Sequence, residues 1–287
     1  MRQKHSGPGS EMPVLRHENS QWLEAGRRKD IRRSVQETGE EDRHQEAMKE
    51  LLIRGLRIRW EEIPEDSWLR SVEALASMQE LLFQAPVTFL TGENGTGKST
   101  LLEAAAVACG FSAEGGTRNY RFSTRDTHSQ LYRALTVIRG SVPLRHGYFL
   151  RAESFYNTAT MEEEYADGDH PSRGYHLKSH GESFLALARD QFHGPGIYFL
   201  DEPEAALSVQ RQFSLLRVIH EAVQSGGQFI IATHSPILTG YPDGEILSFD
   251  NGEIRPVSYE ETDSWRLTKL FLEHRERVLY NLFHEED

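Results

Sequence analysis

The stretch that decides the fold reads Gly92-Glu93-Asn94-Gly95-Thr96-Gly97-Lys98-Ser99-Thr100. It matches G-x-x-x-x-G-K-S, the pattern of a phosphate-binding loop, or P-loop. The run before it, Pro86–Thr91, has the composition of a strand, and the run after it, Leu101–Ala108, that of a helix which Gly110 would end. Strand, glycine-rich loop and helix in this order are the context in which the motif binds phosphate. We therefore expect the chain to bind a nucleoside triphosphate.

Each fixed position of this loop has a chemical role. Glycines let backbone N–H groups surround phosphate oxygens, and the N-terminus of the following helix adds a favourable dipole. Lys98 is expected to reach the β- and γ-phosphates, and the Ser99 hydroxyl to be a ligand of Mg²⁺. The alternative, an ordinary glycine-rich turn, is disfavoured because every fixed position and both flanks fit. The predicted ligands are ATP and Mg²⁺, and the predicted nucleotide-binding residues here are Gly92, Glu93, Asn94, Gly95, Thr96, Gly97, Lys98, Ser99 and Thr100.

A second motif lies at the end of the apolar run Gly196–Leu200, which is followed by Asp201 and Glu202. A buried strand of this kind delivers carboxylates to the sheet edge where Mg²⁺ binds. Asp201 is expected to hold Mg²⁺, usually through water, and Glu202 to polarise the attacking water as general base. A strand that ends in an acidic turn is the alternative interpretation, and the intact P-loop counts against it.

His234 follows another apolar run, Gln228–Ala232. A neutral imidazole at this place can hydrogen-bond the γ-phosphate or orient the attacking water. A single histidine is more often structural, so this prediction depends on the other two motifs. Together they predict a catalytic set of Lys98, Glu202 and His234.

Apolar runs alternate with helical patterns along most of the chain. This alternation predicts β-α-β units and an α/β fold with a largely parallel central sheet buried on both faces. A hairpin with its turn at Asp250-Asn251-Gly252 and an amphipathic helix over 265–283 are expected near the end. The remaining expected strands cover 51–60 and 147–150, and the remaining expected helices cover 179–192 and 204–223.

Residues 1–48 differ from the rest of the chain. Their apolar residues are few, and charges of both signs are dense, so the segment cannot bury enough apolar surface to offset its ordering entropy. We expect a disordered N-terminal tail over 1–48 and a nucleotide-binding domain over 49–287. Met48 directly precedes the first expected strand, which suggests the hypothesis that translation begins there.

Composition bounds the environment and the partners. The chain has 287 residues, a formal net charge of −12 and one cysteine, Cys109. A single cysteine excludes an internal disulfide and fits a reducing compartment. No apolar run approaches the roughly 20 residues that span a bilayer, so we expect a cytoplasmic protein without direct membrane insertion. The acidic balance argues against a surface that coats nucleic acid non-specifically.

In their order and spacing, the P-loop, Asp201-Glu202-Pro203 and Thr233-His234-Ser235-Pro236 resemble the ABC-type ATPases. The segment Ser179-His180-Gly181-Glu182-Ser183 stands where that superfamily has its signature motif, and it also fits a helix capping box. The chain resembles stand-alone bacterial ABC-type ATPases, often labelled AAA family ATPases. These are related to SMC-like and RecF-like ATPases.

This resemblance implies how two chains would assemble. In ABC-type ATPases two subunits sandwich two ATP molecules, and the signature motif contacts the nucleotide of the other subunit. By resemblance, Ser179 and Gly181 would bind that nucleotide, and Glu204–Ser208 would cross an ATP-dependent homodimer interface. The sequence departs from the family by having His180 at a usual glycine position and no clear Q-loop glutamine. Arg151–Ser154, with Glu153, is the substitute we consider.

A basic stretch lies between Phe111 and Arg151, and it holds only two acidic residues, Glu114 and Asp126. One interpretation is a lobe that faces nucleic acid, as expected for an ATPase in DNA repair or phage defence. The other is that these arginines pair with the acidic loop 162–169 and help to neutralise ATP. The arginines concerned are Arg118, Arg121, Arg125, Arg133, Arg139, Arg145 and Arg151.

Two further classes of function stay open, because nothing in the sequence names the protein partner. The chain could be the nucleotide-binding subunit of a membrane transporter, although the altered signature and the missing glutamine argue against this. It could also be an ATP-gated regulator of a toxin or nuclease. Hydrolysis is the more economical expectation, since both Glu202 and His234 are present.

Overall fold

The computed structural model describes residues 51–118, 129–153, 155 and 179–284. All of them belong to the second of the two units into which the chain divides, Ala47–Asp287. The predicted tail 1–48, the start at Met48 and the acidic loop 162–169 lie outside these residues. The same holds for two of the arginines of the basic stretch, Arg121 and Arg125.

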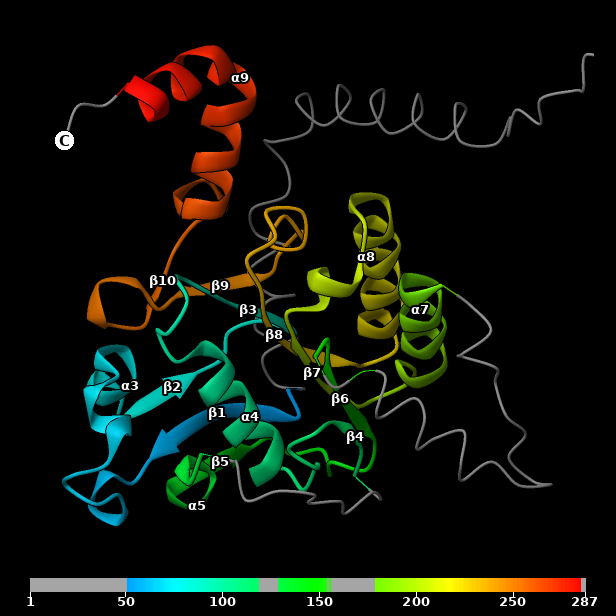
Figure 1. The fold of residues 1–287 in the computed structure, drawn as a ribbon. Coiled ribbons are helices and arrows are strands. Elements are labelled where there is room, and N and C mark those ends of the chain that lie inside the picture. Colours follow the sequence, from blue (N-terminus) through cyan, green and yellow to red (C-terminus); the bar gives the residue numbers. More distant parts are fainter. Residues whose placement is uncertain (1–50, 119–128, 154, 156–178, 285–287) are drawn as a thin grey trace, which may run out of the picture. The chain divides into compact units, whose positions relative to one another are not determined.

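The centre of the fold is a seven-stranded sheet with the order β10-β9-β3-β8-β7-β6-β4 (Figure 1). Its five inner strands are parallel to one another, and the short strand at each edge is antiparallel to its neighbour. This confirms the predicted α/β fold with a largely parallel sheet. The strands are β3 (Val87–Thr91), β4 (Gly116–Thr117), β6 (Gly147–Arg151), β7 (Ile197–Asp201), β8 (Gln228–Ala232), β9 (Glu245–Ser248) and β10 (Arg255–Pro256).

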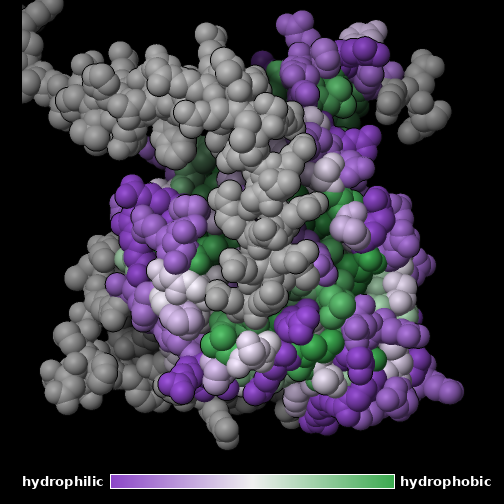
Figure 2. All heavy atoms as spheres, turned by 180° about the vertical axis from the view of Figure 1, so that it is seen from behind, coloured by the Kyte–Doolittle hydropathy of each residue, from purple (hydrophilic) through white to green (hydrophobic). Residues whose placement is uncertain are grey.

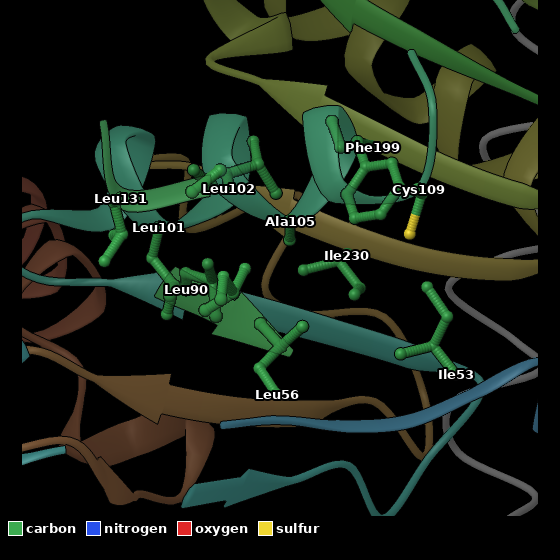
Figure 3. Close-up of a cluster of buried hydrophobic side chains, with 14 of the residues drawn as sticks. Ile53, Leu56, Leu90, Leu101, Leu102, Ala105, Cys109, Leu131, Phe199 and Ile230 are labelled. Carbon is green, nitrogen blue, oxygen red and sulfur yellow. The ribbon is translucent and has the colours of Figure 1, made fainter. Parts of the chain in front are cut away.

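A second, antiparallel sheet has the order β2-β1-β5 and contains β2 (Glu80–Leu82), β1 (Ile53–Ile58) and β5 (Leu135–Arg139). The helix after the P-loop, α4 (Lys98–Ala108), packs against strands of both sheets. Figure 3 shows Leu101 and Ala105 of α4 in one buried cluster with Leu90 of β3, Ile230 of β8 and Leu56 of β1. This buried cluster thus holds α4, and with it the end of the P-loop, against both sheets.

The two faces of the central sheet bury alternate residues of each strand. Leu90, Phe199 and Ile230 point to the α4 side, and their neighbours Phe89, Tyr198 and Phe229 belong to the cluster with α7 (His180–Gln191) and α8 (Val209–Gln224). Side chains alternate between the faces of a strand, so a sheet covered on both sides needs continuous apolar runs. This explains the runs that predicted the strands.

Short helices connect the larger elements. The α-helices among them are α3 (Glu73–Ser77) and α5 (Leu131–Ala134). The 3-10 helices are η2 (Trp60–Glu62), η3 (Trp68–Ser71), η5 (Pro203–Ala206), η6 (Asp250–Gly252) and η7 (Tyr259–Glu261).

The expected helix over 204–223 was wrong at its start. Residues 203–206 form the separate 3-10 helix η5, and Leu207 and Ser208 are extended, so α8 begins at Val209. The expected hairpin exists as the β9–β10 pair, but its second strand is Arg255–Pro256 and not 253–255. Asp250–Gly252 form η6, in which Asn251 has φ 61°.

The last helix, α9 (Asp263–His284), agrees with the predicted amphipathic helix, and none of its residues is buried. Its backbone departs from helical geometry at His274. Leu267, Leu272 and Phe283 are exposed, and hydrophobic and hydrophilic side chains lie beside one another on α9 at the upper right of Figure 2. Among the described residues, no helix combines the length and apolarity needed to cross a membrane.

Candidate nucleotide-binding site

The P-loop joins the end of β3 to the first turn of α4. Gly92, Gly95 and Gly97 have φ of 133°, 84° and 97°, a region that residues with a Cβ rarely adopt. A Cβ on Gly97 would also lie 2.8 Å from Cγ of Leu75. The Thr96 hydroxyl donates to the Glu93 carbonyl over 2.9 Å. The loop is therefore wrapped tightly, with its form set by glycines.

Lys98 is buried at the start of α4, with 4% of its surface exposed. Its Nζ donates to the carbonyls of Gly92 at 2.8 Å and Glu93 at 2.6 Å, so the ammonium group lies over the loop. Burial lowers the pKa of Lys98, and the nearby carboxylates of Glu202 and Asp250 oppose this shift. The surrounding carboxylates thus favour the charged form of Lys98 and burial disfavours it.

Ser99 and Asp201 meet at the carboxyl edge of the sheet. The Ser99 hydroxyl donates to Oδ1 of Asp201 over 2.8 Å. Burial raises the pKa of Asp201, while the Ser99 hydrogen bond and the Arg151 charge lower it. Nε of Arg151 lies 3.3 Å from Oδ2 of Asp201, and another nitrogen of its guanidinium bonds Glu103 at 2.7 Å. Asp201 is thus a buried carboxylate that lies against the guanidinium group of Arg151.

Glu202 directly follows Asp201 and has a left-handed backbone, with φ 47° and ψ 50°. A residue other than glycine in this conformation is strained, and such strain is found at functional sites. The Glu202 amide donates to the Ala232 carbonyl at 2.9 Å. Its side chain stays partly exposed, with Oε1 3.9 Å from Nε2 of His234. That nitrogen is buried and has no hydrogen-bond partner among the described residues.

The same edge has the ligand chemistry that Mg²⁺ requires. The Ser99 hydroxyl and the Asp201 carboxylate supply oxygen donors, which Mg²⁺ prefers to nitrogen or sulfur. Nε2 of His234 lies 3.9 Å from Oε1 of Glu202, has no hydrogen-bond partner among the described residues, and is a group that can bind a phosphate or water oxygen. The residues present therefore fit Mg²⁺ with a nucleotide phosphate, and Ser99 and Asp201 are the residues that would hold the metal.

The predicted signature residues lie elsewhere on the domain. Ser179 is the N-cap of α7, and its capping box with Glu182 is present. A guanidinium nitrogen of Arg211, from α8, lies 3.2 Å from Oγ of Ser179 and 3.1 Å from Glu182. Gly181 packs so closely on Arg211 that a Cβ there would lie 2.7 Å from its guanidinium. The structure thus places Ser179 and Gly181 beside Arg211 in the α7–α8 pair.

The basic stretch is divided between inside and outside. Arg151 is part of the site, and Arg118 donates to the Leu144 carbonyl, so neither belongs to a free basic surface. Arg133, Arg139 and Arg145 are exposed. Arg118 and Arg151 therefore do not support a lobe that faces nucleic acid, and Arg151 agrees with the alternative that these arginines pair with carboxylates.

The contacts of three polar residues of the site were not predicted. Asp250 accepts the Glu93 amide at 2.9 Å and so fixes the beginning of the P-loop. Arg151 balances Asp201, and Glu204 holds the loop that carries His234. Asp250 was assigned to a hairpin turn, and Glu204 to a segment that crosses the dimer interface. Only the order of the strands could have indicated that these two side chains contact the site.

Two sequence families match overlapping parts of the chain. Residues 69–158 match a family described as an AAA domain, and residues 150–239 match one described as "AAA domain, putative AbiEii toxin, Type IV TA system". Together with the P-loop geometry, these matches define a P-loop nucleoside triphosphatase domain. Both matched families are described as AAA domains, and each match covers less than half of the chain.

Relatives with known names or structures are more distant. An ABC transporter G family member STR2 from Medicago truncatula is 26% identical over 174 residues, which cover 52% of this chain. The match spans only 24% of that protein. The SMC head domain from Thermotoga maritima is 18% identical with a TM-score of 0.37, covering 62% of this chain and 93% of its own. The structure of cbiO1 from Clostridium perfringens, part of the ABC transporter complex cbiONQ, is 15% identical with a TM-score of 0.39. The match covers 69% of this chain and 88% of cbiO1.

Proposed function

We propose that this protein binds Mg·ATP at Gly92–Thr100 and hydrolyses it with Glu202 as general base. The observation that carries the proposal is the Ser99–Asp201 hydrogen bond, with Glu202 and His234 beside it at the same edge of the sheet. A P-loop alone would support binding. A carboxylate and an imidazole next to it support hydrolysis.

Each residue has a distinct part in this reaction. Lys98 and the P-loop amides bind and orient the β- and γ-phosphates. Ser99 and Asp201 would hold Mg²⁺, which would neutralise charge at the phosphate oxygens. Glu202 accepts a proton from the attacking water through its carboxylate, which is partly exposed and follows a left-handed backbone. His234 donates or accepts a hydrogen bond through the nitrogen that has no described protein partner.

The active form we propose is an ATP-dependent homodimer. Support comes from the resemblance of Ser179–Ser183 to a signature motif and from the exposure of Ser179, Ala205 and Ser208. In this arrangement the N-terminus of α7 would approach the nucleotide of the second copy, since a helix N-terminus favours an anion.

The test is phosphate release, ATP affinity and molecular mass by light scattering for the wild type and Glu202→Gln. We expect Glu202→Gln to lose at least about 100-fold in turnover, to keep ATP affinity within about threefold, and to dimerise with Mg·ATP. Glu221→Gln, on the exposed side of α8, is the matched control and should behave as wild type. Wild-type turnover in Glu202→Gln would overturn the base assignment, and a persistent monomer would overturn the sandwich.

A role on nucleic acid in repair or phage defence is the biological context that we propose. Exposed Arg133, Arg139 and Arg145 support it, as does the family description that names a putative toxin of a toxin–antitoxin system. Reversing the charge of all three should remove salt-sensitive stimulation of the ATPase by DNA. If the wild type shows no such stimulation, a protein partner such as a toxin, a nuclease or a transporter becomes the object of the search.

A further inference from the structure

Glu204 joins two segments that both border the reacting groups. It lies in η5, directly after the Asp201-Glu202-Pro203 turn. Its Oε1 accepts the backbone N–H of His234 at 2.6 Å, and its Oε2 accepts the Thr233 hydroxyl at 2.7 Å. One carboxylate therefore holds both the backbone N–H of His234 and the side-chain hydroxyl of Thr233.

The loop that carries His234 is fastened from both sides. Thr233 is completely buried, and its hydroxyl oxygen accepts the Ser235 amide at 3.0 Å. The Ser235 hydroxyl donates to Gln212 of α8 at 2.6 Å. A network of satisfied polar groups in a buried setting is rigid, so this loop has little freedom to shift as long as its acceptors are present.

The His234 imidazole is not held by hydrogen bonds of this kind at its Nε2 atom. Nε2 of His234 has no hydrogen-bond partner among the described residues, and its distance to Oε1 of Glu202, 3.9 Å, is too long for a hydrogen bond. The main chain therefore decides where the ring lies. The amide of Glu202 is anchored on β8 through Ala232, so the Glu204 contacts fix His234 relative to Glu202.

We infer that Glu204 is a positioning residue that places His234 for ATP hydrolysis without touching the nucleotide. The inference rests on the proposed hydrolytic function. A carboxylate is suited to this place because both of its partners are donors, an N–H and an O–H. A glutamine would offer one acceptor and one donor, so it would keep only part of the arrangement.

The experiment is a double-mutant cycle between Glu204 and His234, with phosphate release and ATP binding measured for each variant. We expect Glu204→Ala to lower kcat at least about tenfold and to leave the Kd for ATP within about twofold. Glu204→Gln should fall between it and the wild type. If Glu204 acts through His234, Glu204→Ala should lower kcat no further in a His234→Ala background.

Controls separate this inference from misfolding and from failure of the proposed function. Glu221→Ala should leave kcat unchanged, and thermal denaturation checks that each variant is folded. Should Glu204→Ala unfold, Thr233→Val removes one partner of the carboxylate and provides the same cycle. With an active wild type that depends on Glu202, an unchanged kcat, fully additive losses or an equal loss of ATP affinity would overturn the role of Glu204 alone. A wild type without turnover would overturn both proposals.

Discussion

The Ser99 hydroxyl donates a 2.8 Å hydrogen bond to Oδ1 of Asp201, although 102 positions of sequence separate the two residues. Ser99 lies in the first turn of α4, and Asp201 is the last residue of β7. β8 stands between β3 and β7 in the sheet, so the P-loop and the acidic strand end meet across one intervening strand. Parallel strands end at the same edge, and this shared edge brings phosphate-binding and carboxylate groups together.

Replacing Lys98 with alanine should weaken ATP binding. The ammonium group is buried over the loop, and its loss would leave phosphate charge without a basic partner. A charge-assisted hydrogen bond of this kind contributes about 1.5–3 kcal/mol, so the Kd for Mg·ATP should rise at least about tenfold in calorimetric titration. Lys269→Ala is the control, because Lys269 lies over Trp265 on the exposed helix α9. Equal affinities for both variants would contradict the assignment of the P-loop lysine.

Alanine at Gly97 should damage the loop more than alanine at Gly95. Both positions have positive φ, which costs a residue with a Cβ about 1–2 kcal/mol. Only at Gly97 would the new Cβ also collide, at 2.8 Å from Leu75 and 2.9 Å from Val72, whereas no atom lies within 4 Å at Gly95. Urea denaturation and ATP titration should rank Gly97→Ala below Gly95→Ala in both stability and affinity.

Gly194→Ala is the matched control for this series, since Gly194 has φ 65° and open space around it outside the P-loop. It should lose about 1 kcal/mol of stability and no ATP affinity. Equal affinity for Gly97→Ala and the wild type would show that the close packing of the loop on Leu75 is unimportant for binding.

The sequence predicted the groups that local patterns define. Gly92–Thr100, Asp201-Glu202 and His234 each follow an apolar run, and such runs end at one edge of a parallel sheet. The contacts of Glu204 and Asp250 were missed because their partners are 30 and 157 positions away. Such pairs depend on the order of strands and on the turns between them, and residue type alone does not determine either.

The predictions of the helix boundary at residue 204 and of the basic stretch failed for a related reason. Residues 204–223 were predicted as one helix, but Leu207 and Ser208 have an extended backbone and separate η5 from α8. Arg151 was considered as part of a substitute for the Q-loop and as part of the basic stretch, and it ends β6 beside β7, where the register pairs it with Asp201. Net charge along a stretch therefore did not indicate which arginines were already paired.

Tyr198 should make stability fall at high pH. Burial raises its pKa to about 12, against which the hydrogen bond with His193 acts in the opposite direction. An unfolded tyrosine titrates near 10, so between these values the unfolded chain holds fewer protons than the folded one, and stability decreases as pH rises. Between about pH 7.5 and 10.5 the stability difference between wild type and Tyr198→Phe should decrease by about 1 kcal/mol in urea denaturation. A pH-independent difference would contradict the raised pKa.

Gln228 should be essential to stability because its side chain joins the two sheets. It stands at the start of β8, where its Oε1 accepts the Ile53 amide at 2.9 Å and its Nε2 donates to the Ile53 carbonyl at 2.8 Å. Gln228→Leu keeps the volume but leaves a buried N–H and a buried C=O on β1 without partners, at about 1–3 kcal/mol each. The free energy of unfolding in urea should therefore fall by at least about 2 kcal/mol. Gln210→Leu, on the exposed side of α8, should change it by less than about 0.5 kcal/mol. Equal stabilities of the two variants would mean that β1 is held to the central sheet by apolar packing alone.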